Sequence, residues 1–208
     1  MNKVRPQFYL VGNHLAADFA NTIRSKDTGE ESLRDWPDLI YFLEEKGIIA
    51  RQKMQSLLDL SVSVPQESGR AFEAALALRG AIRNGLDHIT NRHVPPEECV
   101  RPINSILRLT EGYDQLVATG NSWTMQYVQR EKRLEWLLAA IARAGAELLV
   151  EGLKAPVRKC ANPKCVLYFY DTSRTGRRRW CSMAACGNRS KVAAFSRRSR
   201  NVSGRQRT

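Results

Sequence analysis

Apolar residues recur at helical spacing through much of the first 155 positions of the chain. One stripe runs from Arg70 to Ile89 and is interrupted only by Arg79, and a broader stripe runs from Glu131 to Leu153. The second stripe covers more than the roughly 100° arc that is typical of a surface helix. We therefore expect two long helices, of which the second lies at the centre of the core.

Two shorter segments, 37–49 and 95–107, also predict helices. Asp35 can cap the first of them and Gly47 can end it. The second begins with two prolines followed by two glutamates, a composition that suits the first turn of a helix.

One segment, 115–128, favours strands instead. A Gly-Asn-Ser turn separates two short stretches rich in β-formers, which predicts a hairpin. Residues 1–155 should thus form a mainly α domain with one small β-hairpin.

Positive charge is concentrated in the last quarter of the chain. The 208 residues have a formal net charge of +12, yet 14 Lys and Arg residues and only one acid, Asp171, lie between Pro156 and Thr208. The composition changes near Pro156, which suggests a domain boundary. The split predicts a polyanion-binding module at 156–200 joined to a nearly neutral domain, followed by a basic tail at 201–208 that we expect to be disordered.

The composition favours a cytoplasmic protein without a membrane span. The sequence has no run of about 18 uncharged apolar residues. Its first residues also lack the apolar block of a signal peptide. We therefore expect the five cysteines to lie in a reducing compartment, where structural disulfides are disfavoured.

Four of these cysteines, Cys160, Cys165, Cys181 and Cys186, form the pattern C-x4-C-x15-C-x4-C. Paired thiolates a few residues apart let one turn supply two ligands to a tetrahedral Zn²⁺. A redox pair would have two intervening residues rather than four. An all-thiolate site leaves no position for water, so the pattern predicts one structural zinc ion and not a hydrolytic centre.

The residues around these cysteines predict a small treble-clef-like zinc finger. The segments 166–171 and 177–181 read as two strands of a hairpin around the turn 172–176, and Ser182 can cap a following helix. About 40 residues bury too little apolar surface to fold alone, and zinc supplies roughly 10–16 kcal/mol in small fingers.

The basic residues of the finger are candidates for nucleic-acid contacts. Four thiolates on Zn²⁺ leave a site charge of −2, which some of the cations can offset, but the positive excess is far larger. Arginines suit the phosphates and guanine edges of a DNA groove, and arginines beside aromatic residues also suit single-stranded RNA. We expect DNA rather than RNA. The candidate contacts are Arg177, Arg178, Arg179, Arg189, Lys191, Arg197 and Arg200.

Near the N-terminus, His14, Asp18 and Asn21 share one face if their segment is helical. These side chains could line a pocket for a small ligand. Alternatively, they cap a helix or tie the segment to neighbouring backbone.

The segments CANPKC and DTSRTGRRRWCSMAACGNRSK closely resemble the CGNR zinc finger, named for the residues that here are Cys186 to Arg189. In that family the finger follows a helical domain called ABATE, near whose start lies a motif like L-x-L-D-F-x-N-T. The stretch LAADFANT at Leu15–Thr22 is similar, with Ala17 where a leucine is common. The resemblance covers nearly the whole chain.

The resemblance implies a bacterial transcription regulator, suggested for stress responses, with zinc at the four cysteines. It also gives Asp18 and Asn21 more weight, either as effector ligands or as braces of the fold. We expect a DNA-binding regulator, with homodimerisation open, and not an enzyme. An RNA- or ribosome-binding protein, and an enzyme with a structural finger, are the alternatives.

Overall fold

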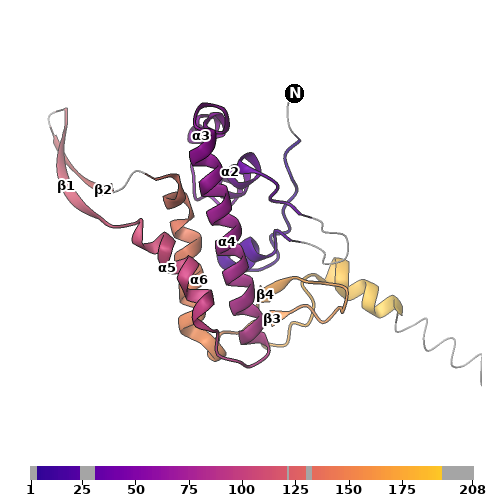
Figure 1. The fold of residues 1–208 in the computed structure, drawn as a ribbon. Coiled ribbons are helices and arrows are strands. Elements are labelled where there is room, and N and C mark those ends of the chain that lie inside the picture. The colour runs from indigo at the N-terminus through magenta and orange to yellow at the C-terminus, as the bar shows by residue number, and fades with distance from the viewer. Residues whose placement is uncertain (1–3, 24–30, 121, 130–132, 194–208) are drawn as a thin grey trace, which may run out of the picture.

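The computed structural model describes residues 4–23, 31–120, 122–129 and 133–193 (Figure 1). Six α-helices, three 3-10 turns, one π-helical turn and two short antiparallel sheets are described there. In chain order the elements are α1 (Leu15–Ala20), α2 (Trp36–Glu45), α3 (Arg51–Ser63), α4 (Pro65–Thr90), η1 (Glu97–Cys99), α5 (Val100–Arg108), β1 (Gly112–Thr119), β2 (Ser122–Gln129), η2 (Leu134–Leu138), α6 (Ala139–Glu151), η3 (Gly152–Lys154), β3 (Val157–Lys159), β4 (Tyr168–Tyr170) and η4 (Met183–Gly187). The fold is mainly α, as the sequence predicts.

The two long apolar stripes correspond to α4 and to η2 followed by α6, so both predicted helices are confirmed. The central helix is α4 rather than α6, because α4 contacts α1, α2, α3, α5 and α6. Glycines let α4 and α6 approach closely: a Cβ on Gly85 would lie 2.7 Å from Leu149, and one on Gly145 would lie 3.0 Å from Ile82. The expectation that the second helix is central was therefore wrong.

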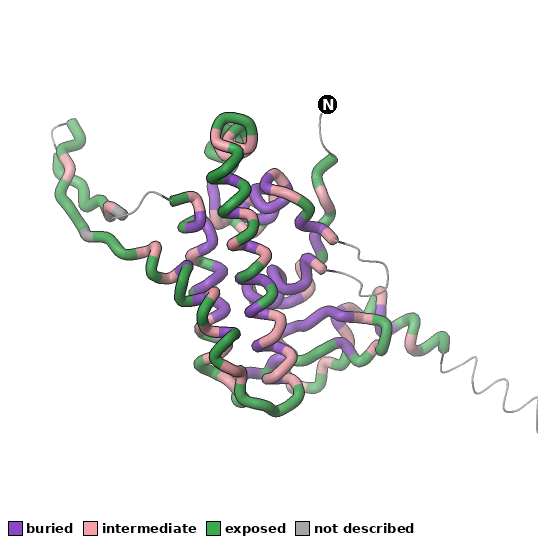
Figure 2. The backbone as a smooth tube through the Cα atoms, viewed as in Figure 1, coloured by how far each residue is buried: buried purple, intermediate pink, exposed green. Residues whose placement is uncertain are grey.

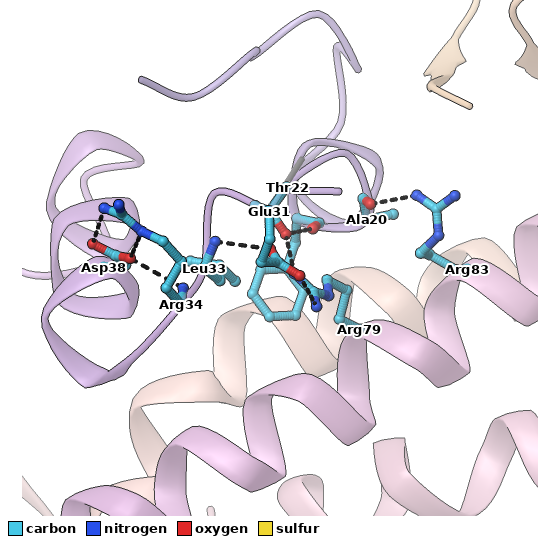
Figure 3. A network of polar contacts seen from close by, with 9 residues as sticks. Ala20, Thr22, Glu31, Leu33, Arg34, Asp38, Arg79 and Arg83 are labelled. Atoms are coloured by element: carbon cyan, nitrogen blue, oxygen red, sulfur yellow. Dashed lines mark hydrogen bonds and ion pairs between the residues drawn. The ribbon is translucent and has the colours of Figure 1, made fainter. Parts of the chain in front are cut away.

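Arg79, the one polar interruption of the α4 stripe, is buried and paired. Its guanidinium donates to both oxygens of Glu31, at 2.7 Å each, and to the Thr22 hydroxyl at 2.9 Å (Figure 3). A buried arginine is tolerated when a bidentate carboxylate satisfies its donors. This ion pair ties α4 to the segment that follows α1.

The predicted short helices are also confirmed. The Asp35 carboxylate accepts from the backbone of Asp38 to cap α2, and Gly47, with φ +67°, follows its end. The second segment begins as η1 and continues as α5. Helix α3 was not predicted, because it has no fully buried residue and no side-chain cap and so lacks both sequence signals of a helix.

The predicted hairpin is confirmed as β1 and β2, which pair in antiparallel register from Gly112 with Gln129 to Thr119 with Ser122. The hairpin stands away from the helices and is largely exposed along its length (Figures 1 and 2). The turn glycine, Gly120, has φ +59°, a conformation that glycine adopts at little cost.

The strand pairing predicted in the finger was wrong. β4 pairs with β3, which precedes the first cysteine, and Arg177 to Trp180 form no strand. The two strands thus enclose the 160–165 turn instead of the 172–176 turn. The reason lies in Asp171, whose carboxylate accepts from the backbone of Arg178 at 3.0 Å and folds the arginine segment into a loop.

β4 contributes to two hydrophobic cores. Tyr168 and Val157 belong to the core of the helical domain, whereas Phe169 and Leu167 pack with the cysteines. Alternate residues of a strand point to opposite faces, so β4 joins the finger to α1, while its partner β3 contacts α4. Within the described part of the chain, no helix has the length and apolar character needed to span a bilayer.

Candidate metal centre and nucleic-acid interface

The four cysteines that the sequence singles out meet in one cluster. The sulfur atoms of Cys160, Cys165, Cys181 and Cys186 all lie within 4.8 Å of one another, and none forms a disulfide. Four thiolates held 2.3 Å from a tetrahedral Zn²⁺ are separated by about 3.8 Å. Cys165 Sγ and Cys181 Sγ are 3.7 Å apart, which fits that geometry.

Local structure explains how each pair of sulfurs is presented. Cys160 directly follows β3, and the Cys165 amide donates to the Asn162 carbonyl at 2.8 Å, closing the turn between the first two ligands. Cys181 precedes Ser182, whose hydroxyl caps the next helical turn by accepting from the backbone of Ala185. The cap predicted from the sequence is thus confirmed, and the helix continues through residue 193.

Three N–H groups point at the sulfurs. The Cys181 amide donates to Cys160 Sγ at 3.4 Å, and the Asn162 side chain donates to Cys186 Sγ at 3.4 Å. The Arg189 guanidinium reaches the same Cys186 sulfur at 3.5 Å. Hydrogen bonds of this kind stabilise the thiolate form of a metal ligand. Arg189 therefore offsets the negative charge of the site.

The closeness of the thiols separates their pKa values. Hydrogen bonds from Cys165 and Cys181 lower the pKa of Cys160 to about 2. The same contact with Cys160 raises the pKa of Cys165 to about 12, and that of Cys181 also rises. Four like charges cannot gather here unless a cation is present, so binding of a divalent ion displaces protons from the cluster.

A second set of contacts joins the finger to the start of the chain. Tyr168 N donates to Asn21 Oδ1 and Asn21 Nδ2 donates to Tyr168 O, both at 2.8 Å. Tyr170 N donates to the Gly12 carbonyl at 2.7 Å. The N-terminal segment therefore occupies the edge of β4 opposite β3, where an unpaired strand edge would otherwise remain.

Asp18 and His14 support the same segment. Asp18 Oδ1 accepts from the Gly12 amide at 2.7 Å, and its other oxygen pairs with Lys46 at 2.8 Å. His14 caps α1 by accepting from Ala16 N, and its ring stacks on Tyr170 with centroids 5.5 Å apart. Burial lowers the pKa of His14 despite nearby carboxylates. The three residues proposed for a ligand thus all have partners within the protein.

Comparisons with protein families agree with this architecture. Residues 13–152 match the family model ABATE, described as "Putative stress-induced transcription regulator". The chain belongs to the ABATE family. Residues 157–199 of this ABATE protein match the CGNR zinc finger, so the four-cysteine cluster is the metal site of a zinc finger and fits one Zn²⁺. A search of curated proteins finds no match.

The ABATE protein uses neighbouring arginines of its finger differently. Arg178 is half-buried: its guanidinium lies 4.1 Å from the centroid of the Phe169 ring and donates to the carbonyls of Val11, Trp180 and Cys181. Its donors thus hold the finger to the N-terminal segment. Arg177, one residue earlier, is exposed.

Arg83 is an interdomain residue that sequence reasoning missed. It donates to the Ala20 carbonyl at 2.6 Å (Figure 3). It also donates to the Val166 carbonyl at 3.3 Å and lies over the Tyr168 ring. Arg83 lies four residues after Arg79, within the arc of the α4 stripe, and the helical pattern alone did not identify these partners. The role of such a cation becomes clear only when the packing of the finger against the helix is known.

The remaining candidate nucleic-acid contacts are surface residues. Arg177, Arg179, Arg189 and Lys191 are exposed on the loop before Cys181 and on the helix after Ser182. Arg179 also lies over the Trp180 ring, 5.2 Å from its centroid. Arg197 and Arg200, like the tail at 201–208, lie outside the described residues.

Proposed function

We propose that this ABATE protein is a zinc-dependent, DNA-binding transcription regulator. The finger, at 156–200, makes the DNA contacts, and the helical domain, at 1–155, carries regulation and dimerisation. The observation that carries the proposal is the closed four-thiolate site that holds an arginine-bearing loop beside the start of a basic helix. A structural zinc ion fixes such a surface without taking part in chemistry.

The proposed DNA contacts are Arg177, Arg179, Arg189 and Lys191, with Arg197 and Arg200 further along the chain. Phosphate contacts by arginine and lysine position a protein on the duplex, and arginine on a guanine edge adds sequence preference. Arg178 is left out of this set because its donors are engaged within the protein.

Burial of the aromatic residues favours DNA over RNA. Recognition of single-stranded RNA relies on exposed aromatic rings on which bases stack. In the finger, Tyr168 and Phe169 are fully buried, while Tyr170 and Trp180 are half-buried and already contact other rings or cations. The described part of the finger, up to residue 193, therefore offers charge and little stacking surface, which suits the duplex backbone.

A salt titration tests DNA binding directly. With about five phosphate contacts, the slope of log affinity against log salt should be near −4.5 on duplex DNA. Arg177→Gln should reduce that slope by about 0.9 and leave zinc content unchanged. Arg101→Gln, an exposed arginine on α5, is the matched control. Equal affinity for unrelated single strands at every salt concentration would favour the RNA-binding alternative instead.

The proposal assigns no catalytic role to the chain. A zinc ion with four thiolate ligands has no open position for water or substrate. The cluster also needs reduced cysteines, which fits the cytoplasm. Turnover of any substrate that survives deletion of 156–208 would count against a regulator without enzymatic activity.

A homodimer is part of the proposal, and the β1–β2 hairpin supports it. Leu116, Trp123 and Met125 lie on one face of the hairpin by register and are 64–69% exposed. An isolated two-stranded hairpin is marginal in water, and a second copy could cover this face by a symmetric contact. The double variant Trp123→Ser, Met125→Ser should be a monomer in light scattering where the wild-type protein is a dimer. If the wild-type protein is itself a monomer at high concentration, the proposed homodimer is excluded.

The proposal gives Asp18 and Asn21 a bracing role rather than contact with an effector. The polar atoms of both side chains bond to backbone groups or to Lys46. Their contact with the segment beside β4 offers a route by which the state of the helical domain can reach the finger.

A further inference from the structure

The protein has a basic recess where its two family modules meet. The recess has a volume of about 400 Å³ and lies between the end of α4, the segment that contains β3, and the arginine loop before Cys181. We call it the seam recess. Among the described residues, its charged lining residues are Arg92, Arg158, Lys159, Arg178 and Arg179, and none is acidic.

Two of the five cations are neutralised by carboxylates outside the lining. Arg158 pairs with Asp171 at 3.0 Å, and Lys159 pairs with Asp87 at 2.7 Å. The other three have no carboxylate at ion-pair distance among the residues that the structure describes. Arg92 donates to the Leu153 carbonyl, Arg178 to carbonyls only, and Arg179 lies over a ring.

Three uncompensated cations around one recess repel one another, and an anion would relieve that repulsion. The end of α4 opposes this effect, because a helix C-terminus carries about half a negative charge. Near that end, however, the carbonyls of Asp87, His88 and Ile89 already accept from the amides of the three following residues, 91–93. The net charge around the recess therefore remains positive.

The lining also indicates the chemical class of the anion. The Arg92 and Arg179 guanidinium groups match phosphate oxygens in a bidentate manner, whereas Arg178 contributes its charge because its donors bond to carbonyls. The side-chain donors of Thr90 and Asn91 bond to the Asp87 carbonyl, so the arginines are the main anion-binding groups. No aromatic residue lines the recess within the part of the chain that the structure describes, so these residues offer no stacking surface for a base. The volume is within the range of small-molecule sites and much larger than one water molecule needs.

We propose that the seam recess is a phosphate-binding site, which takes two or more neighbouring phosphoryl groups. Both modules contribute to it: Arg92 follows α4, whereas Arg179 belongs to the finger. A bound ligand would therefore cross-link the end of α4 to the loop that presents the proposed DNA contacts. Phosphate binding here does not depend on DNA binding by the finger.

The phosphoryl groups can come from a free small molecule or from a nucleic-acid backbone, and one experiment separates these sources. The full-length, zinc-loaded protein is titrated calorimetrically with pyrophosphate, and separately with duplex DNA. Arg92→Gln is compared with Arg101→Gln, which lies on α5 and outside the recess. Arg92 is chosen because it belongs to neither the finger nor the proposed DNA contacts.

If the source is a small molecule, pyrophosphate binds, and Arg92→Gln weakens that binding by about tenfold or more while Arg101→Gln does not. If the source is the backbone, pyrophosphate does not bind, and Arg92→Gln weakens duplex binding by a similar factor. The proposal is overturned if Arg92→Gln changes neither titration, because any pyrophosphate binding then occurs elsewhere on the basic chain. Thermal unfolding of both variants without ligand confirms that they remain folded.

Discussion

Asn21 and Tyr168 exchange two hydrogen bonds of 2.8 Å, although 147 positions separate them in the chain. The side-chain amide of Asn21 imitates a neighbouring strand: it accepts from the Tyr168 amide and donates to the Tyr168 carbonyl. This pair attaches the zinc finger to the residue that ends α1. The zinc site and the helical domain are thus parts of one packed structure.

Replacing Asn21 tests this attachment. Asn21→Ala should lower the free energy of unfolding by about 2–5 kcal/mol, because two buried backbone groups of Tyr168 lose their partners. Urea unfolding of the zinc-loaded protein measures the change. Asn104→Ala, at an exposed position on α5, is the control and should change stability little. An equal, small effect of both substitutions would show that the exchange contributes nothing to stability.

Arg177 and Arg178 are adjacent residues of the same type, yet we predict that replacing them has different effects. Arg178→Gln should cost about 2 kcal/mol or more of stability, since a charged donor to three carbonyls is lost. Arg177→Gln should leave stability unchanged and weaken duplex DNA binding. Chemical denaturation and DNA titration of both variants measure the difference. If Arg177→Gln destabilises the fold as much as Arg178→Gln, the division of roles between them is wrong.

Arg189 should affect zinc affinity as well as DNA binding. Its guanidinium contacts Cys186 Sγ, and loss of an outer-shell partner typically weakens metal affinity by about 10–100-fold. Arg189→Gln should therefore bind zinc more weakly in competition with a chromophoric chelator. Lys191→Gln, which removes a charge two residues further along the exposed helix, should retain the wild-type zinc affinity. If the two variants bind zinc equally tightly, the contact of Arg189 with Cys186 Sγ does not contribute to zinc affinity.

His14 predicts a pH dependence of stability near neutrality. Burial lowers its folded-state pKa below the ordinary value of 6.5, so the folded protein favours the neutral ring, which can accept from Ala16 N. This contribution is fully present above pH 6.5 and is lost as the pH falls from 6.5 through the folded-state pKa.

The measurement compares urea unfolding of wild-type and His14→Asn protein between pH 7.5 and about 5.5. Asparagine can cap α1 without titrating. As the pH falls, the free energy of unfolding of the wild-type protein should decrease relative to that of the His14→Asn variant. A difference that is constant over this range would mean that His14 titrates equally in the folded and unfolded states.

Parts of this structure were predictable because their signals are local. The stripe of α4 reports its helix and its buried face, and Asp35 and Gly47 mark the two ends of α2. The spacing of the four cysteines was sufficient to predict the zinc site, because two turns must each present two sulfurs to one ion.

Other parts depend on partners that lie far away in the chain. The three-residue strand β4 has the same β-forming composition whichever segment it pairs with, so composition did not identify β3 as its neighbour. The Asp171 carboxylate accepts from the Arg178 backbone and keeps the arginine segment from pairing as a strand, while the Arg178 side chain bonds to carbonyls of its own. Asn21 was recognised as a candidate, but only the packing of the finger supplies its partner.

The central claim is that zinc shapes the finger into a DNA-binding surface, and a zinc titration of DNA binding tests it most directly. Metal-free protein in reducing buffer is mixed with labelled duplex DNA, and zinc is added while fluorescence anisotropy is followed. The account predicts little binding without metal and a rise that is complete at one zinc ion per chain. Metal-free protein that binds the duplex as tightly as zinc-loaded protein would contradict it.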